Sequence, residues 1–285
     1  DLVEQMINCA DGKKLNLKQK DINLNGWSIE SRIYAEDPLK DFLPSIGRLI
    51  DYHEPQQKNK TEIIRNDTGV SGGSDISIFY DPMISKLAVH EKTRTKAIDL
   101  MINALQQYYI TGVDHNIAFL ISTLKNKDFR SGSISTNFIK ENYPKGYYFN
   151  YGLSKSLIEK FNYAAIFIYK KLNINITNLD LSVISKKITS DFEIKSHKLI
   201  DKNLSMIVAH KNKEIVLHSL WKINQKIMEL NINDEKCFVK INKINNFNQF
   251  SITIEDCSLD LIVAPNKNKA LFDYMPEIKL EDLSK

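Results

Sequence analysis

The feature that most constrains the fold is a pair of changes in hydrophobic spacing along the 285-residue chain. Between about residues 28 and 90, apolar residues occur in short alternating runs such as Ser28 to Ile33, which is typical of half-buried strands. From Thr93 to Asn142 they recur at helical spacing, with Thr93 as a candidate helix N-cap. After Leu153 one long helical pattern gives way to evenly spaced alternating runs. We therefore expect an α+β fold with two differently built parts.

The first part is expected to combine one leading helix, several strands and three later helices. The sequence predicts a helix from Asp1 to Ala10 that stops at Asp11-Gly12. It predicts strands at residues 28–33, 48–53, 62–66, 76–80 and 83–90, with a tight turn at Gly69, Gly72 and Gly73. It predicts further helices beginning at Thr93 and ended by Gly112, at 116–124 and at 136–142.

In the second part, the sequence pattern predicts a long helix beside an antiparallel sheet or barrel. The helix spans Leu153 to Leu172, and alternating runs follow at residues 227–232, 237–242 and 250–254. The aromatic residues of the helix are either core residues or a partner-binding face; core packing is favoured for Phe161, while Tyr163 and Tyr169 fit both interpretations.

Composition excludes several classes of function. The net charge of +4 comes without basic clusters interleaved with aromatic residues, so nucleic-acid binding is not expected. Three widely spaced cysteines form no zinc-ligand pattern and indicate a reducing compartment, here taken as the cytoplasm. The longest apolar run, about Ile117 to Ile121, is far shorter than the roughly 20 residues of a membrane span. No membrane association is expected.

Apart from Arg65, few residues of the sequence are candidates for a catalytic or binding role. The glycines at 69, 72 and 73 follow neither a Walker nor a Rossmann pattern, and the six histidines show no metal-ligand spacing. Asp81, Lys86 and the adjacent pair Glu36 and Asp37 are interpreted as structural, because adjacent strand residues point to opposite faces.

Five segments of the first part together resemble a known family. They are Gly26 to Pro38 (GWSIESRIYAEDP), Phe42 to Gly47 (FLPSIG), Tyr80 to Leu87 (YDPMISKL), Asp114 to Leu120 (DHNIAFL) and Asp128 to Ile139 (DFRSGSISTNFI). Together they resemble the C-terminal part of biotin carboxylase in biotin-dependent acyl-CoA carboxylases, most of all the α subunits of propionyl-CoA carboxylases. The resemblance implies that residues 1–145 form the C-terminal lobe of an ATP-grasp biotin carboxylase.

Arg65 is the one residue to which we assign a catalytic and cofactor-binding role. An arginine offers a fixed fork of donors suited to a ureido oxygen, a carboxylate or a phosphate. On residue type alone, a solvated strand arginine is the favoured interpretation. The resemblance implies more, because in biotin carboxylases an arginine at the matching place contacts biotin and bicarbonate. There it would stabilise negative charge that develops on the ureido oxygen.

The resemblance also gives the second part a function. Residues 146–272 would be a BT-like domain, a long helix inside an antiparallel β-barrel, which binds the carboxyltransferase β subunit. The segment from Asn173 to Leu181 would help to grip that subunit, and residues 273–285 would be a linker. The biotin carboxyl carrier domain would be a further partner.

The complete enzyme implied by the resemblance is a ligase that carboxylates biotin with ATP, Mg²⁺ and bicarbonate. The family's ATP and Mg²⁺ residues would precede Asp1, and its Ala-Met-Lys-Met biotinylation motif does not occur in the chain. The chain also lacks an initiator methionine and begins inside an amphipathic helix, so a fragment or a processed product is expected. Two alternatives stay open: a non-catalytic module that only binds the β subunit, and another system such as pyruvate or methylcrotonyl-CoA carboxylase.

Overall fold

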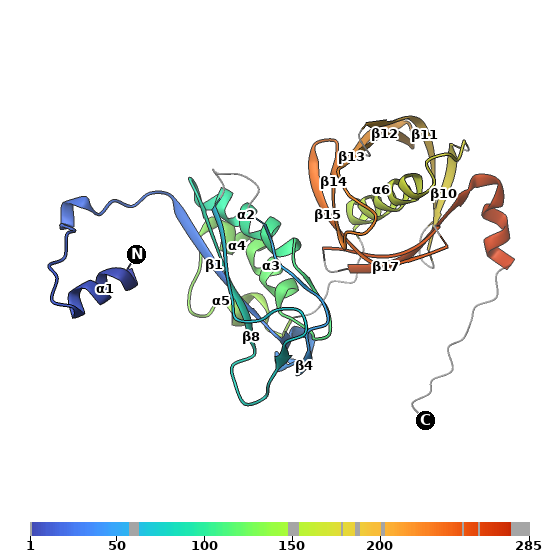
Figure 1. The fold of residues 1–285 in the computed structure, drawn as a ribbon. Coiled ribbons are helices and arrows are strands. Elements are labelled where there is room, and N and C mark those ends of the chain that lie inside the picture. The colour runs from blue at the N-terminus through green and yellow to red at the C-terminus, as the bar shows by residue number, and fades with distance from the viewer. Residues whose placement is uncertain are drawn as a thin grey trace, which may run out of the picture.

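The chain folds into a mixed lobe, a β-barrel that encloses a helix, and a separate N-terminal helix (Figure 1). The computed structural model describes residues 2–56, 63–147, 154–177, 179–185, 189–200, 203–246, 248–255 and 257–274. The N-terminal helix α1 (Leu2–Ala10) stands away from the lobe on an extended connection (Figure 1). Its apolar residues are exposed, including Leu2 at 83% and Met6 at 69%. The expected helix is confirmed, but its apolar face contacts no described element closely enough to be buried.

The lobe is built on a three-stranded antiparallel sheet that is covered by helices on one face. The strand order is β1 (Trp27–Tyr34), β8 (Met83–Glu91) and β6 (Ile63–Thr68), so β8 lies in the middle. Helices α2 (Arg94–Gln106) and α3 (Ile117–Lys125) pack against the sheet. Shorter elements complete the lobe: η1 (Gln19–Asp21), β2 (Glu36–Asp37), η2 (Pro38–Lys40), β3 (Leu43–Pro44), β4 (Gly47–Arg48), β5 (Tyr52–His53), β7 (Asp75–Ile76), β9 (Tyr109–Ile110), α4 (Lys127–Ser131) and α5 (Phe138–Asn142).

Two expectations for the lobe are corrected by local hydrogen bonds and turns. Helix α2 begins as expected, with the Thr93 hydroxyl accepting the Lys96 amide at 3.3 Å, but it ends at Gln106 and not at Gly112. Gly112 instead has a φ of 102° in the turn after β9, where a Cβ would lie 2.1 Å from the Arg48 carbonyl oxygen. Only glycine fits such a position.

The strand expected at residues 76–80 is also wrong, because β7 ends at Ile76. The Ser77 hydroxyl accepts the Phe79 amide at 3.1 Å, and the Asp81 carboxylate accepts the Met83 amide at 3.1 Å. Such side-chain acceptors offer the backbone an alternative to a strand ladder. The resulting turn leaves Phe79 84% exposed.

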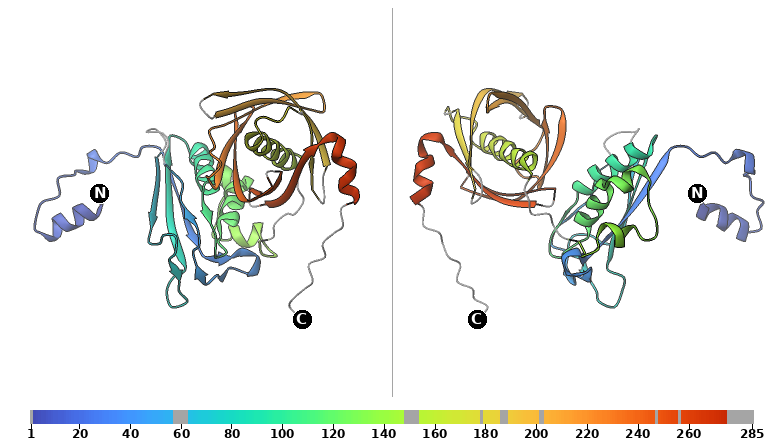
Figure 2. Two further views of the ribbon diagram at one scale, coloured as in Figure 1. Left: turned by 45° about the vertical axis from the view of Figure 1, so that its right-hand side comes forward. Right: turned by 180° about the vertical axis from the view of Figure 1, so that it is seen from behind.

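The second part is a closed barrel around helix α6 (Lys155–Leu172) (Figures 1 and 2). Its eight strands in the described part of the chain are neighbours in sequence order, and Leu181 of the first pairs with Pro265 of the last. They are β10 (Asp180–Ile184), β11 (Thr189–Ile200), β12 (Asn203–His210), β13 (Lys213–Ser219), β14 (Ile227–Ile232), β15 (Glu235–Asn245), β16 (Gln249–Ile254) and β17 (Cys257–Pro265). The segment η3 (Asn266–Tyr274) follows, and most of the expected linker at 273–285 lies outside the described residues.

The helix fills the barrel with side chains on every side. Every residue from Phe161 to Lys170 is buried, and the strands contribute alternating residues such as Leu204, Met206 and Val208 of β12. Tyr163 and Tyr169 are each 6% exposed, so both belong to the core and not to an exposed partner-binding face. The expected helix within an antiparallel barrel is thereby confirmed.

A carboxylate at one end of the barrel joins the barrel to the lobe. Oε2 of Glu255 accepts from Nζ of Lys125 in α3 at 2.8 Å, and Oε1 accepts from Nζ of Lys160 in α6 at 3.0 Å. Burial raises the pKa of Glu255, but the two lysines outweigh burial and hold that pKa below its ordinary value. The ammonium of Lys226 also lies 5.7 Å from the ring centre of Tyr109. These polar contacts join the lobe to the barrel.

The enclosure of α6 predicts a large cost for truncating its buried aromatic residues. Phe167 is fully buried, so we expect Phe167→Ala to lower the free energy of unfolding by about 3–5 kcal/mol. Trp221, 3% exposed, reports on the barrel by fluorescence once Trp27 of the lobe is replaced by Phe. Glu159→Ala near the exposed N-terminal end of α6 is the control and should change stability by less than about 0.5 kcal/mol. Equal losses in both variants would contradict an enclosed helix.

The Glu255 contact predicts an acid-sensitive arrangement of lobe and barrel. Because the folded-state pKa of Glu255 is lowered, its contribution is present above the ordinary pKa of about 4.3 and disappears as the pH falls through the lower folded value. Glu255→Gln should therefore broaden the distance distribution at pH 7 between spin labels on cysteines introduced at positions 92 and 213. The background carries Cys9→Ser and Cys257→Ser, which remove the accessible native thiols. The parent should show the same broadening only below about pH 4. Glu193→Gln, which removes an ion pair within the barrel, is the control. An unchanged distribution in Glu255→Gln would refute the role of this contact.

Candidate functional site

The lobe sheet has one face free of helices, and this face gathers charged side chains. Cross-strand pairing places Arg65 beside Ala88 and Ala88 beside Glu30, while Asp67 lies beside Lys86 and Lys86 beside Arg32. Since alternate residues of a strand share a face, these side chains all lie on the surface opposite α2 and α3. We call this surface the outer face; its members are Ser28, Glu30, Arg32, Ile63, Arg65, Asp67, Lys86, Ala88 and His90.

Arg65 lies on the outer face with its guanidinium held by a neighbour on the same strand. Its Nε donates to Oδ1 of Asp67 at 2.9 Å, and the side chain is 71% exposed. The hydrogen bond and charge of Asp67 raise the pKa of Arg65, which keeps the guanidinium charged. No other hydrogen bond or ion pair is recorded for Arg65 within the described part of the chain. The two terminal nitrogens therefore remain available as donors to a group that binds the outer face.

The outer face is open and not a pocket. Five cavities lined by described residues have volumes between about 40 and 600 Å³, and Arg65 lines none of them. An open sheet surface with a paired arginine can bind a planar anion or a urea-like oxygen, but it does not exclude water. The described residues around Arg65 thus form an open surface that does not enclose a ligand.

The other residues weighed from the sequence have mainly structural surroundings. The Asp37 carboxylate accepts the Leu39 amide at 2.9 Å and pairs with Lys40 at 2.8 Å, while Asp81 caps the turn before β8. Burial and the charge of Asp81 raise the pKa of Glu36. These carboxylates lie beyond the ends of β1 and β8, away from Arg65. Of the four residues considered beside Arg65, Lys86 alone shares the outer face with it.

The glycine-rich segment and the histidines show no binding geometry. Gly73 has a φ of 92° in the expected turn, which connects β6 to β7. Among the described residues, no three His, Cys, Asp or Glu side chains gather closely enough to hold a metal ion. None of the described helices is at once long and apolar enough to cross a bilayer.

The opposite end of the barrel contains a buried lysine that sequence analysis missed. Lys170 is 1% exposed, and its Nζ donates to the carbonyl oxygens of Ile174 at 3.1 Å and Ile176 at 2.8 Å. Burial lowers the pKa of Lys170. The side chain thus holds the chain segment that leaves α6, residues 173–177, against the end of the helix. The sequence signal was a lysine placed among the core-facing residues of the last helical turn.

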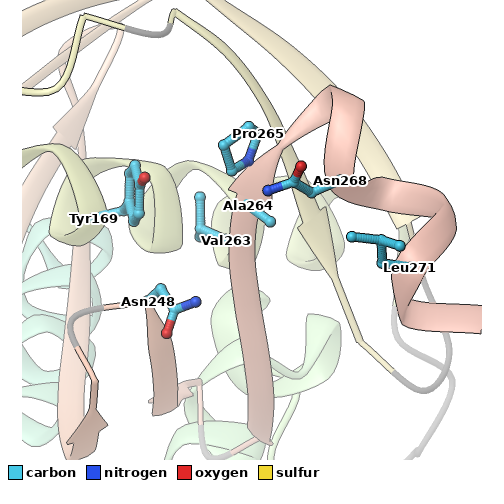
Figure 3. Close-up of a pocket in the computed structure, with 7 residues that line it drawn as sticks. All are labelled: Tyr169, Asn248, Val263, Ala264, Pro265, Asn268 and Leu271. Atoms are coloured by element: carbon cyan, nitrogen blue, oxygen red, sulfur yellow. The ribbon is translucent and has the colours of Figure 1, made fainter. Parts of the chain in front are cut away.

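A small apolar pocket lies at this same end of the barrel (Figure 3). Its volume is about 230 Å³, and Tyr169 of α6 faces strand β17 across it. The remaining lining residues come from the strand ends and η3: Asn248, Val263, Ala264, Pro265, Asn268 and Leu271. Small-molecule sites usually measure roughly 300–1,000 Å³, so this pocket suits one apolar side chain better than a cofactor.

Comparison with known families agrees with the two-part architecture. Residues 30–141 match the family described as biotin carboxylase C-terminal domain, and residues 179–277 match the propionyl-coenzyme A carboxylase BT domain. The chain contains a biotin carboxylase C-terminal domain followed by a propionyl-CoA carboxylase BT domain. Arg65 lies inside the first match, and Lys170 lies just before the second.

Individual relatives match about half of the chain. The propionyl-CoA carboxylase alpha chain of Homo sapiens, described as mitochondrial, is 51% identical over 148 residues, which are 52% of this chain and 20% of that protein. The alpha chain of Ruegeria pomeroyi is 44% identical over 163 residues, covering 52% of this chain and 24% of its own length. The biotin carboxylase domain of 2-oxoglutarate carboxylase from Hydrogenobacter thermophilus is 42% identical with a TM-score of 0.47, covering 50% and 30% of the two chains. The matched part of this chain thus spans about a fifth to a quarter of the two alpha chains.

Proposed function

We propose that this chain is part of the biotin carboxylase subunit of a propionyl-CoA carboxylase-type ligase. The observation that carries the proposal is the succession of a biotin carboxylase C-terminal domain and a BT domain in one polypeptide. The domain limits proposed from the sequence are residues 1–145, 146–272 and a linker at 273–285. We propose a cytoplasmic location, consistent with three cysteines that are all free thiols.

In this proposal Arg65 binds biotin and bicarbonate on the outer face. Its side chain fits that role because the guanidinium is charged, exposed and oriented by Asp67, with its terminal nitrogens available as a fork. When bound, biotin supplies a ureido group that accepts and transfers the carboxyl group. Arg65 would hold the ureido oxygen and stabilise the negative charge that develops on it.

ATP and Mg²⁺ do not fit the described residues of this chain. No three carboxylates or other metal ligands gather in them, and no phosphate-binding glycine pattern is present in the sequence. In the proposed enzyme these ligands, and the opposite wall of the biotin site, belong to residues outside this sequence.

The barrel is proposed to dock the carboxyltransferase β subunit, and the biotin carboxyl carrier domain is a further proposed partner. The match to the BT domain supports docking, and the segment from Asn173 to Leu181 is the proposed contact. Lys170 prepares that segment, because its ammonium ties two of the segment's carbonyl groups to the end of α6. A segment that is ordered before binding loses less conformational entropy when it binds.

The catalytic proposal predicts a selective loss on removing the Arg65 guanidinium. In the complete biotin carboxylase that carries this sequence, Arg65→Ala should lower kcat/KM for free biotin by about a hundredfold, because a donor to the developing charge is lost. Arg48→Ala removes an exposed arginine from β4 of the same lobe and serves as the control. Bicarbonate-dependent ADP release measured against biotin concentration gives the comparison. Equal activity of the parent and Arg65→Ala would refute the assignment.

The docking proposal predicts that Lys170 supports partner binding from inside the barrel. Lys170→Met keeps the aliphatic stem but leaves the Ile174 and Ile176 carbonyls without their donor, so the segment 173–177 should loosen. The full chain should then bind the carboxyltransferase β subunit about tenfold more weakly by surface plasmon resonance. Lys155→Met at the exposed start of α6 is the control, and Trp221 fluorescence verifies that the barrel stays folded. Unchanged affinity with Lys170→Met would show that another surface docks the partner.

A further inference from the structure

Asn66, the residue after Arg65, lies on the opposite face of β6. Arg65 points outward, whereas Asn66 is half-buried and pairs with Leu87, a fully buried residue of β8. Asn66 and Arg65 are joined by one peptide bond. Contacts that fix the Asn66 side chain on the inner face of the sheet therefore also restrain the Cα of Arg65.

Both ends of the Asn66 amide are held by hydrogen bonds. The Tyr108 hydroxyl donates to Oδ1 of Asn66 at 2.6 Å. Nδ2 of Asn66 donates to the Tyr52 hydroxyl at 3.3 Å and to the Glu54 carboxylate. The reverse orientation of the amide would set its carbonyl oxygen against a carboxylate. The partners therefore admit one orientation of the side chain.

Tyr108 connects this amide to the middle strand of the sheet. Its side chain is fully buried, and its hydroxyl lies 3.0 Å from the hydroxyl of Ser85 in β8. Burial raises the pKa of Tyr108, so the phenol keeps its proton and remains a donor. Tyr52 extends the network, since its hydroxyl donates to Oγ1 of Thr68 at the end of β6 at 3.0 Å. The hydrogen bonds thus join β6, β8, β5 and the end of α2.

Strand β6 depends on such a network because it lies at the edge of the sheet. In the described part of the lobe it is paired only with β8, so backbone hydrogen bonds secure one side of the strand alone. Above the strand, Asp67 orients the Arg65 guanidinium. Below it, the Asn66 amide is the only side chain of β6 whose recorded hydrogen bonds reach both β5 and Tyr108, in the described residues.

We infer that Asn66, held by Tyr108, Tyr52 and Glu54, is a positioning residue for Arg65. It fixes the position of edge strand β6, and so the position from which the Arg65 guanidinium contacts the ureido oxygen or bicarbonate. This inference rests on the proposed role of Arg65 in biotin carboxylation. Asn66 touches no substrate, and its effect on the reaction passes through Arg65.

A double-mutant cycle in the complete biotin carboxylase tests the inference with free biotin as the substrate. Asn66→Ala should lower kcat/KM for biotin about tenfold in the parent, within the usual range of coupling between neighbours, and less than about twofold in an Arg65→Ala background. Tyr108→Phe removes only the donor hydroxyl and should follow the same pattern with a smaller loss. Asn242→Ala, which removes an exposed asparagine–threonine hydrogen bond in the barrel, is the control.

The outcomes separate positioning from plain structural support. A loss that is equally large in the Arg65→Ala background would overturn the inference, because a fold defect would act without Arg65. So would full activity of Asn66→Ala and Tyr108→Phe in the parent. If Arg65→Ala itself leaves kcat/KM unchanged, the proposed function fails first and the inference fails with it. Thermal unfolding of each variant shows whether it folds. If Asn66→Ala does not fold, the result for Tyr108→Phe decides whether the inference stands.

Discussion

The barrel depends on one constraint: a helix that is apolar on all sides must be enclosed on all sides. Ten consecutive residues of α6, from Phe161 to Lys170, are buried, so no stripe of the helix remains for solvent. An open sheet covers only one side of a helix, whereas a closed barrel covers every side and leaves no unpaired strand edge. The pairing of Leu181 with Pro265 closes the ring, which makes that contact as important to the helix as any core residue.

The up-and-down order of the strands places different connections at the two ends of the barrel. Connections alternate between the ends, so the turns around residues 234 and 255 lie at one end and face the lobe. The C-terminus of α6, the segment held by Lys170 and the small pocket lie at the other end. Changes at one end can therefore alter the arrangement of lobe and barrel while the other end keeps its shape. The end that faces the lobe contains several ion pairs, including those of Glu255. At the other end, Lys170 holds residues 173–177 through hydrogen bonds to two of their carbonyl groups.

Periodic patterns predicted the regular elements well and the irregular connections poorly. The alternation of residues 227–232 gave β14 with its observed bounds, and Thr93 was correctly expected to cap α2. The end of α2 was misplaced because Gly112 was interpreted as a helix stop, whereas the backbone crowding at Arg48 that requires a glycine arises only in three dimensions. The turn at Phe79 was mistaken for a strand because two side-chain hydrogen bonds outweighed an alternating pattern.

The candidate site shows the same limit at the level of single side chains. A sequence can suggest Arg65 by residue type and motif, but its orientation depends on contacts with residues that are distant in the chain. Tyr108 lies 42 positions from Asn66, and no local pattern links a tyrosine after α2 to an asparagine on β6. Because an edge strand is fixed by backbone hydrogen bonds on one side only, its buried side chains determine how precisely its exposed ones are held. The outer face of this lobe therefore owes its geometry to polar groups on the inner face, where a hydrophobic pattern alone would have placed only apolar ones.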